Sequence, residues 1–446
     1  MPREAHIEAA LGEHTIVWIF AFMNRQVIWA FFIVGLLLPT SAGAAVIAHA
    51  FTEVNTQQTT VSTSYVDITG AAITSGNFTA GKKYLLVISA QLGDTVGNKR
   101  DYIRALHGTT VFAESEMIIR DVDAAQRTVY GWMTVWTAVS GEGIKLQFAT
   151  AAAGTATADY ITLLAINLSD DVTENTDWFF AESATNLGLT TTFQDGGAIT
   201  FTPGTASHDW LVLSYAQSVV TAGGPFPISR LDRSGEATSS LPEARRQPIG
   251  TAEINGYPLA RVFTLAAASN TFKEQSALDT GTSGTRLHSA IFALNLNKFR
   301  NHAFAYTEAD SALSATDYAT QLQTLSVTPD VISDVWVGAY WGFDRNASAR
   351  EAEFRVQLDN SDQPAGQTTS NLQFAGGNDG AADEHPMILH TMPNLSAAAH
   401  TIDLDASSDS ATGAPAGQQM TLWAVTMELA AAGAAAPQRM LLGVGQ

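Results

Sequence analysis

The spacing of glycine and lysine residues at positions 76–82 nearly matches the motif of a phosphate-binding loop. A true match would predict that the chain binds a nucleotide. The pattern Gly76-x-x-x-x-Gly81-Lys82 lacks the Ser or Thr that should follow the lysine and hold Mg²⁺, because the next residue is Lys83. The motif also needs a following helix, whose N-terminus binds the phosphate. The run YLLVI at 84–88 is instead typical of a strand. We therefore interpret Gly81 as a turn residue.

Side chains that bind metals form only loose groups in this sequence. The chain has no cysteine, no H-E-x-x-H zinc motif and no G-x-S-x-G nucleophile elbow. Two acidic segments, GGNDGAADEH and DLDASSDSATG, offer clustered oxygen ligands of the kind that Ca²⁺ prefers. Neither fits a D-x-[DN]-x-[DN]-G loop, and acidic clusters usually mark solvated loops. We expect no cofactor, with calcium as the alternative. The candidate calcium ligands are Asp379, Asp383, Glu384, Asp403, Asp405 and Asp409.

Two tryptophans are the candidate ligand-binding residues. In TVYGWMTVWTA the period of two places Trp132 and Trp136 on one face of a strand. Exposed aromatics in this arrangement stack on sugar rings. The corresponding strands PLARVFTLA and PMILHTM carry no aromatic pair, which favours packing in a core or between domains. Both interpretations stay open at this point.

Three copies of one unit account for most of the chain. A Thr and a turn precede a strand at FTAGKKYLLVISA, FTPGTASHDWLVLSYA and VTPDVISDVWVGAYW. The strands ITLLAINL, SAIFALNL and TLWAVTMEL close the units, and the short alternating run at the middle of each unit contains an Arg. Landmarks that keep one order at nearly one spacing indicate tandem repeats. The mid-unit arginines are Arg104, Arg230 and Arg355.

An aromatic residue followed by a glutamate opens each unit. The glutamates are Glu53, Glu182 and Glu308. A catalytic acid seldom occurs three times in one chain, so we interpret these side chains as structural or as charges that guard strand edges. His49 and His302 recur at the start of two units, which also favours a structural role.

The units predict an all-β fold of three tandem antiparallel β-sandwiches of jelly-roll type after an N-terminal hydrophobic helix. Short alternating runs separated by Gly, Asn, Asp, Ser and Thr dominate each unit. The last strand of each unit is apolar on both faces, which predicts a central position. Short linkers predict either a semi-rigid rod or a compact cluster of three domains. The predicted domains are 45–172, 173–299 and 300–429.

The segments outside these domains are predicted to be an N-terminal targeting segment and a C-terminal tail. Residues 1–44 contain an apolar run at 27–38 and the small residues Ala42-Gly43-Ala44, the layout of a secretory signal peptide. An uncleaved membrane anchor over 15–38 is the alternative. Residues 430–446 form an Ala/Gly tether with an apolar end, read either as a frayed terminus or as a docking peptide.

The composition limits the partners that the chain can have. The 446 residues carry 43 acidic and 23 basic side chains, a net charge of −20, and such a surface repels nucleic acid and anionic lipid. The absence of cysteine excludes disulfides and thiolate metal sites. The remaining classes are exterior proteins that associate with themselves, with a neighbouring structural subunit, or with a glycan or cell-surface receptor.

The F-T-x-G turn, the hydrophobic strand after it and the closing A-x-N-L strand resemble jelly-roll modules of phage fibres and spikes. They are also similar to the globular heads of the complement and tumour-necrosis-factor superfamily. The resemblance covers residues ~49–429 and implies exterior structural or receptor-binding roles in oligomers. The signal-like N-terminus departs from most virion proteins and favours a bacterial surface or secreted protein, or an unusual membrane-linked virion protein. We expect a non-enzymatic structural protein of a fibre, spike, coat or surface assembly, with adhesion as an addition and a secreted glycan-binding protein as the alternative.

Overall fold

The computed structural model describes residues 45–430 apart from 97–98, 121–127, 152–153, 222–224, 237–241, 246–252, 309–310, 313–319, 345–350, 364–371, 376–386 and 409–415. The predicted N-terminal hydrophobic helix and the C-terminal tail therefore lie outside the described residues. The chain from Val46 onward forms one compact unit, and all the regular structure described below belongs to it. Within the described residues no helix is long and apolar enough to cross a bilayer.

Module 1 is the first antiparallel sandwich and runs from β1 to β10. Its strands are β1 (His49–Val54), β2 (Gln58–Thr60), β3 (Val66–Ile73), β4 (Lys83–Asp94), β5 (Arg100–His107), β6 (Thr110–Val111), β7 (Met117–Arg120), β8 (Thr128–Thr137), β9 (Ile144–Thr150) and β10 (Ala156–Asn167). Two short 3₁₀ turns interrupt the strands, η1 (Ser75–Asn77) and η2 (Ala113–Ser115).

Module 2 repeats the same order from β11 to β19. Its strands are β11 (Trp178–Ser183), β12 (Leu187–Leu189), β13 (Gln194–Phe201), β14 (His208–Val220), β15 (Pro227–Arg233), β16 (Glu243–Arg245), β17 (Ile254–Leu265), β18 (Asn270–Leu278) and β19 (Gly284–Asn295). The turn η4 (Leu296–Lys298) leads out of this module.

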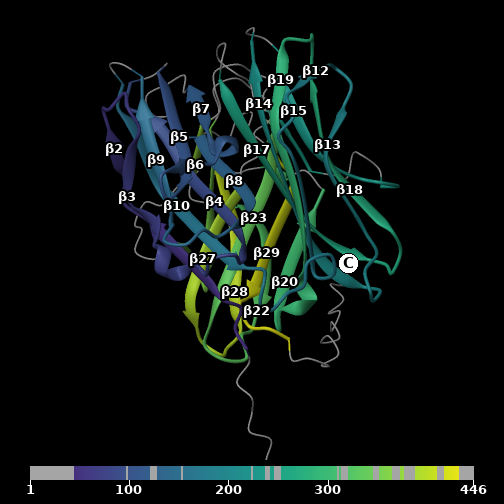
Figure 1. Cartoon of the computed structure of the whole chain (residues 1–446). Coiled ribbons are helices and arrows are strands. Elements are labelled where there is room, and N and C mark those ends of the chain that lie inside the picture. The colour runs from purple at the N-terminus through teal and green to yellow at the C-terminus, as the bar shows by residue number, and fades with distance from the viewer. Residues whose placement is uncertain are drawn as a thin grey trace, which may run out of the picture. The chain divides into compact units, whose positions relative to one another are not determined.

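Module 3 completes the unit from β20 to β29. Its strands are β20 (His302–Thr307), β21 (Ser311–Ala312), β22 (Thr320–Val327), β23 (Ser333–Asp344), β24 (Glu351–Leu358), β25 (Ser361–Gln363), β26 (Leu372–Ala375), β27 (Met387–Leu395), β28 (His400–Ser408) and β29 (Ala416–Thr426). The architecture is thus the predicted series of three jelly-roll-like sandwiches (Figure 1).

Each module has an inner sheet and an outer sheet with matching strand orders. The inner sheets are β1-β10-β4-β8, β11-β19-β14-β17 and β20-β29-β23-β27. The outer sheets are β3-β9-β5-β7, β13-β18-β15-β16 and β22-β28-β24-β26, and the short strands β6 and β25 add to β5 and β24 in modules 1 and 3. The last strand of each module lies between the first and third long strands, as predicted from its apolar faces.

The burial of the strands follows from this layering. The inner strand β4 is buried at every position after its first, whereas the outer strands β3 and β5 mix buried residues with exposed or partly buried ones. An inner sheet is covered on one face by its own outer sheet and on the other by a neighbouring module. Near-continuous apolar runs are the expected pattern for a sheet that is covered twice.

The registers define which residues of the three modules are equivalent. Ala165, Ala293 and Ala424 of the closing strands lie opposite Leu86, Val212 and Val337, respectively. Residues at equal offsets from these positions are equivalent between the modules. The repeat detected in the sequence is thus also a repeat of strand pairing.

The three inner sheets meet along their edge strands β8, β17 and β27, and every pair of these strands is in contact. Strand β17 also pairs with β7 through Ile254 and Ile118, so the inner sheet of module 2 continues into the outer sheet of module 1. The modules form a compact cluster, which decides between the two arrangements that the short linkers allowed.

The stretch that resembled a phosphate-binding loop is a turn before a strand. Gly81 has a φ of +80°, a conformation that L side chains rarely adopt, and its N–H donates to the carbonyl of Ala138.

At the opposite ends of the unit, Val46 forms an antiparallel bridge with Glu428. The first and last strands of the unit therefore begin and end next to each other.

Candidate functional site

Equivalent side chains join the modules near the start of each inner sheet. The imidazole Nε2 of His49 in module 1 lies 2.9 Å from Asp334 Oδ2 in module 3. His302 Nε2 of module 3 lies 3.1 Å from Asp209 Oδ2 of module 2. At the third interface the Lys83 ammonium of module 1 lies 5.5 Å from the centroid of a Trp178 ring in module 2.

These three contacts occupy one pair of positions in the repeat. The first strand of each module begins at His49, Trp178 or His302. Their partners lie on strands β4, β14 and β23, three residues before the equivalent positions Leu86, Val212 and Val337. These partners are Lys83, Asp209 and Asp334. The first strands of modules 1, 3 and 2 reach modules 3, 2 and 1, in that order. Head-to-tail contacts of one kind that return to their starting point make a closed ring.

A second set of contacts follows the same direction. The Tyr215 hydroxyl of module 2 donates to the backbone carbonyl of Glu114 in module 1 over 3.1 Å. The Tyr340 hydroxyl of module 3 donates to the carbonyl of Glu243 in module 2 over 3.0 Å. Burial raises the pKa of both phenols, so they stay neutral donors.

Ser89 of module 1 holds the third copy of the tyrosine position, and it accepts a hydrogen bond from the N–H of Leu389 in module 3 over 3.3 Å. A serine is too short to reach a distant carbonyl. At the interface of modules 1 and 3 the backbone of β27 therefore supplies the donor, and the side chain is the acceptor instead of the donor.

The repeated glutamates act at these interfaces. Glu53 Oε1 accepts the backbone N–H of Thr391 on the edge strand β27 over 2.9 Å, and the same oxygen lies 3.7 Å from His390 Nδ1. This contact gives Glu53 a structural role between modules, one of the two roles predicted for the repeated glutamates. Glu308 lies 4.0 Å from Arg261 of the edge strand β17.

The interface between modules 1 and 2 differs from the other two at this point. His390 and Arg261 occupy equivalent positions, opposite Val337 and Val212, and the third such position holds the uncharged Thr134. The glutamate that reaches this interface is Glu182, and burial raises its pKa. Burial and the charge of Glu182 also raise the pKa of Glu114 across the interface.

The edge strands β8 and β17 lie close together at a glycine of module 1. A Cβ on Gly131 of β8 would lie 2.6 Å from Pro258 Cγ of β17. Gly131, Pro258 and Met387 occupy the same position in β8, β17 and β27. A proline is also suited to an edge strand, because it has no N–H to leave unpaired.

The outer sheets carry a polar ladder that recurs between modules. Arg104 donates to Gln147 Oε1, and Gln147 in turn donates to Asp67, which also pairs with Lys145. Module 2 repeats this ladder, and module 3 keeps its arginine but replaces the amide by a carboxylate. The equivalent contacts are Arg230 with Gln275, Gln275 and Lys273 with Asp195, and Arg355 with Asp405.

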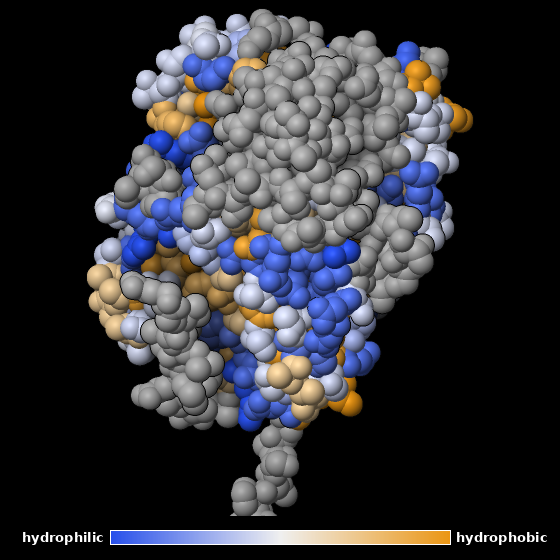
Figure 2. Space-filling model, turned by 180° about the vertical axis from the view of Figure 1, so that it is seen from behind, coloured by the Kyte–Doolittle hydropathy of each residue, from blue (hydrophilic) through white to orange (hydrophobic). Residues whose placement is uncertain are grey.

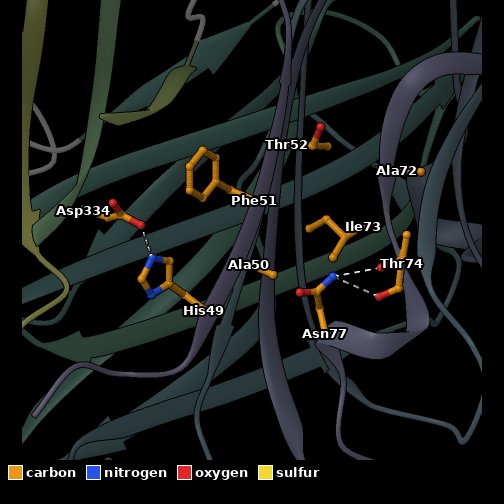
Figure 3. A pocket seen from close by; sticks show the side chains of 9 residues that line it. All are labelled: His49, Ala50, Phe51, Thr52, Ala72, Ile73, Thr74, Asn77 and Asp334. Carbon is orange, nitrogen blue, oxygen red and sulfur yellow. Dashed lines mark hydrogen bonds and ion pairs between the residues drawn. The ribbon is translucent and has the colours of Figure 1, made fainter. Parts of the chain in front are cut away.

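A pocket of about 360 Å³ opens where modules 1 and 3 meet (Figure 3). Its walls include the His49–Asp334 pair, the Phe51 ring and the Asn77 amide. Asn77 Nδ2 donates to Thr74 Oγ1 over 3.0 Å, which fixes the amide at the rim. The Phe51 ring and the His49–Asp334 pair lie on one side of strand β1, and Thr74 and Asn77 lie on its other side (Figure 3).

The two tryptophans proposed to stack on sugars lie inside module 1. Trp132 is 0% exposed and Trp136 is 6% exposed. Both pack with Phe112, and Trp136 also contacts Phe78 and Tyr84. Neither indole presents a face to a glycan, so core packing is the interpretation that the structure supports.

Two of the six calcium candidates, Asp403 and Asp405, lie within the described residues. Asp379, Asp383, Glu384 and Asp409 lie outside the described residues. Asp403 and Asp405 belong to strand β28 rather than to a loop, and they accept hydrogen bonds from Gln321 and Arg355. In the described part of the chain, no three His, Asp or Glu side chains could hold a metal ion together.

The residues that sequence reasoning missed are the interface partners Asp209, Asp334, Tyr215 and Tyr340. Each lies at a fixed offset from the aligned position of its strand, so their common spacing was the available signal. The histidines opposite the two aspartates were recognised as structural, but their partners were not.

On the face shown in Figure 2, hydrophobic residues of the described surface form small groups among hydrophilic ones.

No protein-family model matches this chain, and neither does any curated protein sequence. Solved structures similar to it include one described as the triple jelly roll fold and turret assembly in an archaeal virus, at 11% identity. That match covers 86% of this chain and 96% of the other, with a TM-score of 0.20. A structure of Sulfolobus Turreted Icosahedral Virus matches at 11% identity over 87% and 99% of the two chains, with a TM-score of 0.19.

A structure of infectious bursal disease virus, Gt strain, matches at 8% identity over 89% of this chain and 87% of the other, with a TM-score of 0.22. The similar structures thus include viral proteins, one of them described as a jelly roll. At such TM-scores the likeness carries no argument about what this chain does.

Proposed function

We propose that the chain is a non-enzymatic structural subunit of an exterior assembly, such as a coat, spike, fibre or surface layer. The observation that carries the proposal is the closed ring of equivalent contacts between modules. The acidic, imidazole and phenolic groups that recur along the chain are used to join modules to one another. Such a subunit is a rigid body that presents three similar outer sheets.

The polar ladders on these outer sheets support lateral self-association or contact with a neighbouring structural subunit. Arg104 and Arg230 stack over Tyr65 and Phe193 at 3.8 and 3.7 Å, respectively. A guanidinium held by a ring and a cross-strand partner is pre-organised, so it loses little entropy when a partner covers it. Secretion through the N-terminal segment and adhesion remain part of the proposal.

Assembly is measured on the purified full chain by mass photometry and negative-stain microscopy across protein concentration. We expect oligomers or ordered arrays that weaken in the double variant Arg104→Ala/Arg230→Ala. Val61→Ala, a change at an exposed position of module 1, is the matched control. A chain that stays monomeric up to high concentration contradicts the proposal.

A glycan-binding protein is the second candidate, and the pocket between modules 1 and 3 favours it. The lining includes the Phe51 ring and the Asp334 carboxylate on one side of β1, and the Thr52 hydroxyl and the Asn77 amide on the other (Figure 3). A hollow with a few placed polar groups is typical of a site for a small ligand, which here could be a sugar. Glycan-array binding that disappears in Phe51→Ala supports this candidate, and an array without signal rejects it.

A further inference from the structure

One layer of the sandwich core is apolar in two modules and polar in the third. In the outer sheets Ile103 lies opposite Phe148 in module 1, and Phe354 lies opposite Ala406 in module 3. The equivalent pair in module 2 is Ser229 opposite Ser276. All six residues are at most 3% exposed, so their surroundings are comparable.

The next position along the same strands shows the same difference. Leu146 and Leu404 are fully buried in modules 1 and 3, and the equivalent residue of module 2 is Glu274, which is also 0% exposed. Facing it from the inner sheet is Arg286, 3% exposed, where module 1 has the small residue Ala158.

These polar residues of module 2 form one network. Glu274 Oε2 lies 3.1 Å from Arg286 Nη1, and the other carboxylate oxygen accepts the hydroxyls of Ser229 and Ser276. The guanidinium also donates to the backbone carbonyls of Gln194 over 3.2 Å and of Asp195 over 3.0 Å. The network therefore connects strands β13, β15, β18 and β19.

Strand β13 is shaped around this network. A Cβ on Gly196 would lie 2.1 Å from Glu274 Oε2 and 2.8 Å from Arg286 Nη1. A register shift at this place is common to β13 and to the equivalent strands β3 and β22, and in module 2 the N–H of Gly197 also donates to Ser289 Oγ over 3.0 Å. Any side chain at position 196 would collide with the ion pair.

Stability alone does not explain a buried ion pair in this place. Removing two charges from water is costly, and well-packed apolar residues often serve as well or better. The apolar layers of modules 1 and 3 show that the same sandwich closes without charges. A second consideration is specificity, because tandem β-modules in one chain can exchange strands while they fold.

A wrong exchange would separate the two charges. If β18 took the place of β9 in module 1, Glu274 would face Ile103 and Ala158 in an apolar interior. Module 2 would in turn receive Leu146 and keep the Arg286 guanidinium buried without its carboxylate. Breaking a buried pair in this way is strongly unfavourable, because each charge is left uncompensated.

We propose that the Glu274–Arg286 network is a pairing lock that commits β18 and β19 to module 2 and prevents strand exchange with modules 1 and 3. The lock acts within one chain and needs no ligand. It is the sandwich counterpart of a buried polar residue that fixes the register of a coiled coil.

The test replaces the polar layer by the residues of module 1, in the variant Ser229→Ile/Ser276→Phe/Glu274→Leu/Arg286→Ala. A matched control changes the module 1 layer to the residues of module 3, in the variant Ile103→Phe/Phe148→Ala, which exchanges apolar for apolar. Both are refolded from denaturant as full chains, and the yield of soluble, correctly folded chain is measured by size exclusion.

Strand pairing is read with cysteine reporters, because the natural chain has none. Asp195 and Gln275 are direct partners on β13 and β18, and Asp67 and Gln147 are the equivalent partners on β3 and β9. The pair Asp195→Cys/Gln275→Cys reports native pairing under oxidising refolding. The pair Asp67→Cys/Gln275→Cys forms a disulfide only when β18 enters module 1.

We expect the exchange disulfide to rise at least about fivefold in the apolar-layer variant, with a matching fall in refolding yield, while the control variant behaves like the natural chain. Equal yield and no exchange disulfide in the apolar-layer variant overturn the proposal. If that variant gives no folded fraction, the shape-retaining pair Glu274→Gln/Arg286→Met replaces it, and unchanged exchange there overturns the proposal as well.

Discussion

Substituting one glycine tests whether the modules close at the edge strands β8 and β17. In Gly131→Ala the new methyl group would lie 2.6 Å from Pro258 Cγ and 3.1 Å from Pro258 Cβ. Carbon atoms in contact are normally about 3.5–4.0 Å apart. The proline ring or one of the two strands must therefore move by roughly 1 Å to admit the methyl group.

This displacement takes place in a buried layer, where overpacking costs about 1–3 kcal/mol. We expect the free energy of unfolding in urea, followed by tryptophan fluorescence, to fall by that amount in Gly131→Ala. The double variant Gly131→Ala/Pro258→Ala relieves the collision, so the two changes are not additive. Their coupling energy should be at least about 0.5 kcal/mol, the lower bound for residues in contact.

Gly188 of β12 provides the matched control, because a Cβ there meets no atom within 4 Å. Gly188→Ala should change the free energy of unfolding by no more than about 0.5 kcal/mol. If Gly131→Ala proves as harmless as this control, β8 and β17 do not approach closely and the ring of modules is not closed in the way described. Additive effects of the two changes at the interface would lead to the same conclusion.

Three further substitutions probe the interfaces and the polar core. Glu53→Ala removes the acceptor of the Thr391 N–H and should cost about 1–2 kcal/mol with faster amide exchange along β27, whereas the same exchange rate in both proteins would contradict the contact. Tyr340→Phe leaves the Glu243 carbonyl without its hydroxyl donor and should lower the free energy of unfolding by about 1 kcal/mol. Burial raises the pKa of Glu274 from 4.5 to about 7, so folding favours the protonated side chain. The stability that this protonation contributes is fully present below pH 4.5 and is lost as the pH rises through about 7. Unfolding free energy measured against pH should fall over that window, and Glu274→Gln should flatten the slope.

The strands of this protein are largely readable from its sequence, because period-two alternation and turn residues are local signals. The closing strands were placed at the centre of their sheets from apolar residues on both faces, and their registers confirm this. The repeat also carried over, from Arg104 and Arg230 to the ladders that they form on the outer sheets.

The interface partners were not readable, because they are far apart in the chain. His49 and its aspartate are separated by 285 residues, and alternation assigns a side chain to a face without saying which module covers that face. The same ambiguity affected Trp132, whose face could have been solvated or covered. Sequence matching also aligned Gly81 with Gly204, whereas the backbone position with positive φ is held by Ser207, at +64°.

The bridge between Val46 and Glu428 gives the unit a single pole for its covalent attachments. A protein fused to either end of this unit would be attached next to the Val46–Glu428 bridge, and the loops at the far end of the unit would remain accessible. In a lattice of such units, a tether at that pole would leave all three outer sheets available to neighbours. Fluorescent proteins added before residue 46 and after residue 430 should therefore report a short mutual distance by energy transfer.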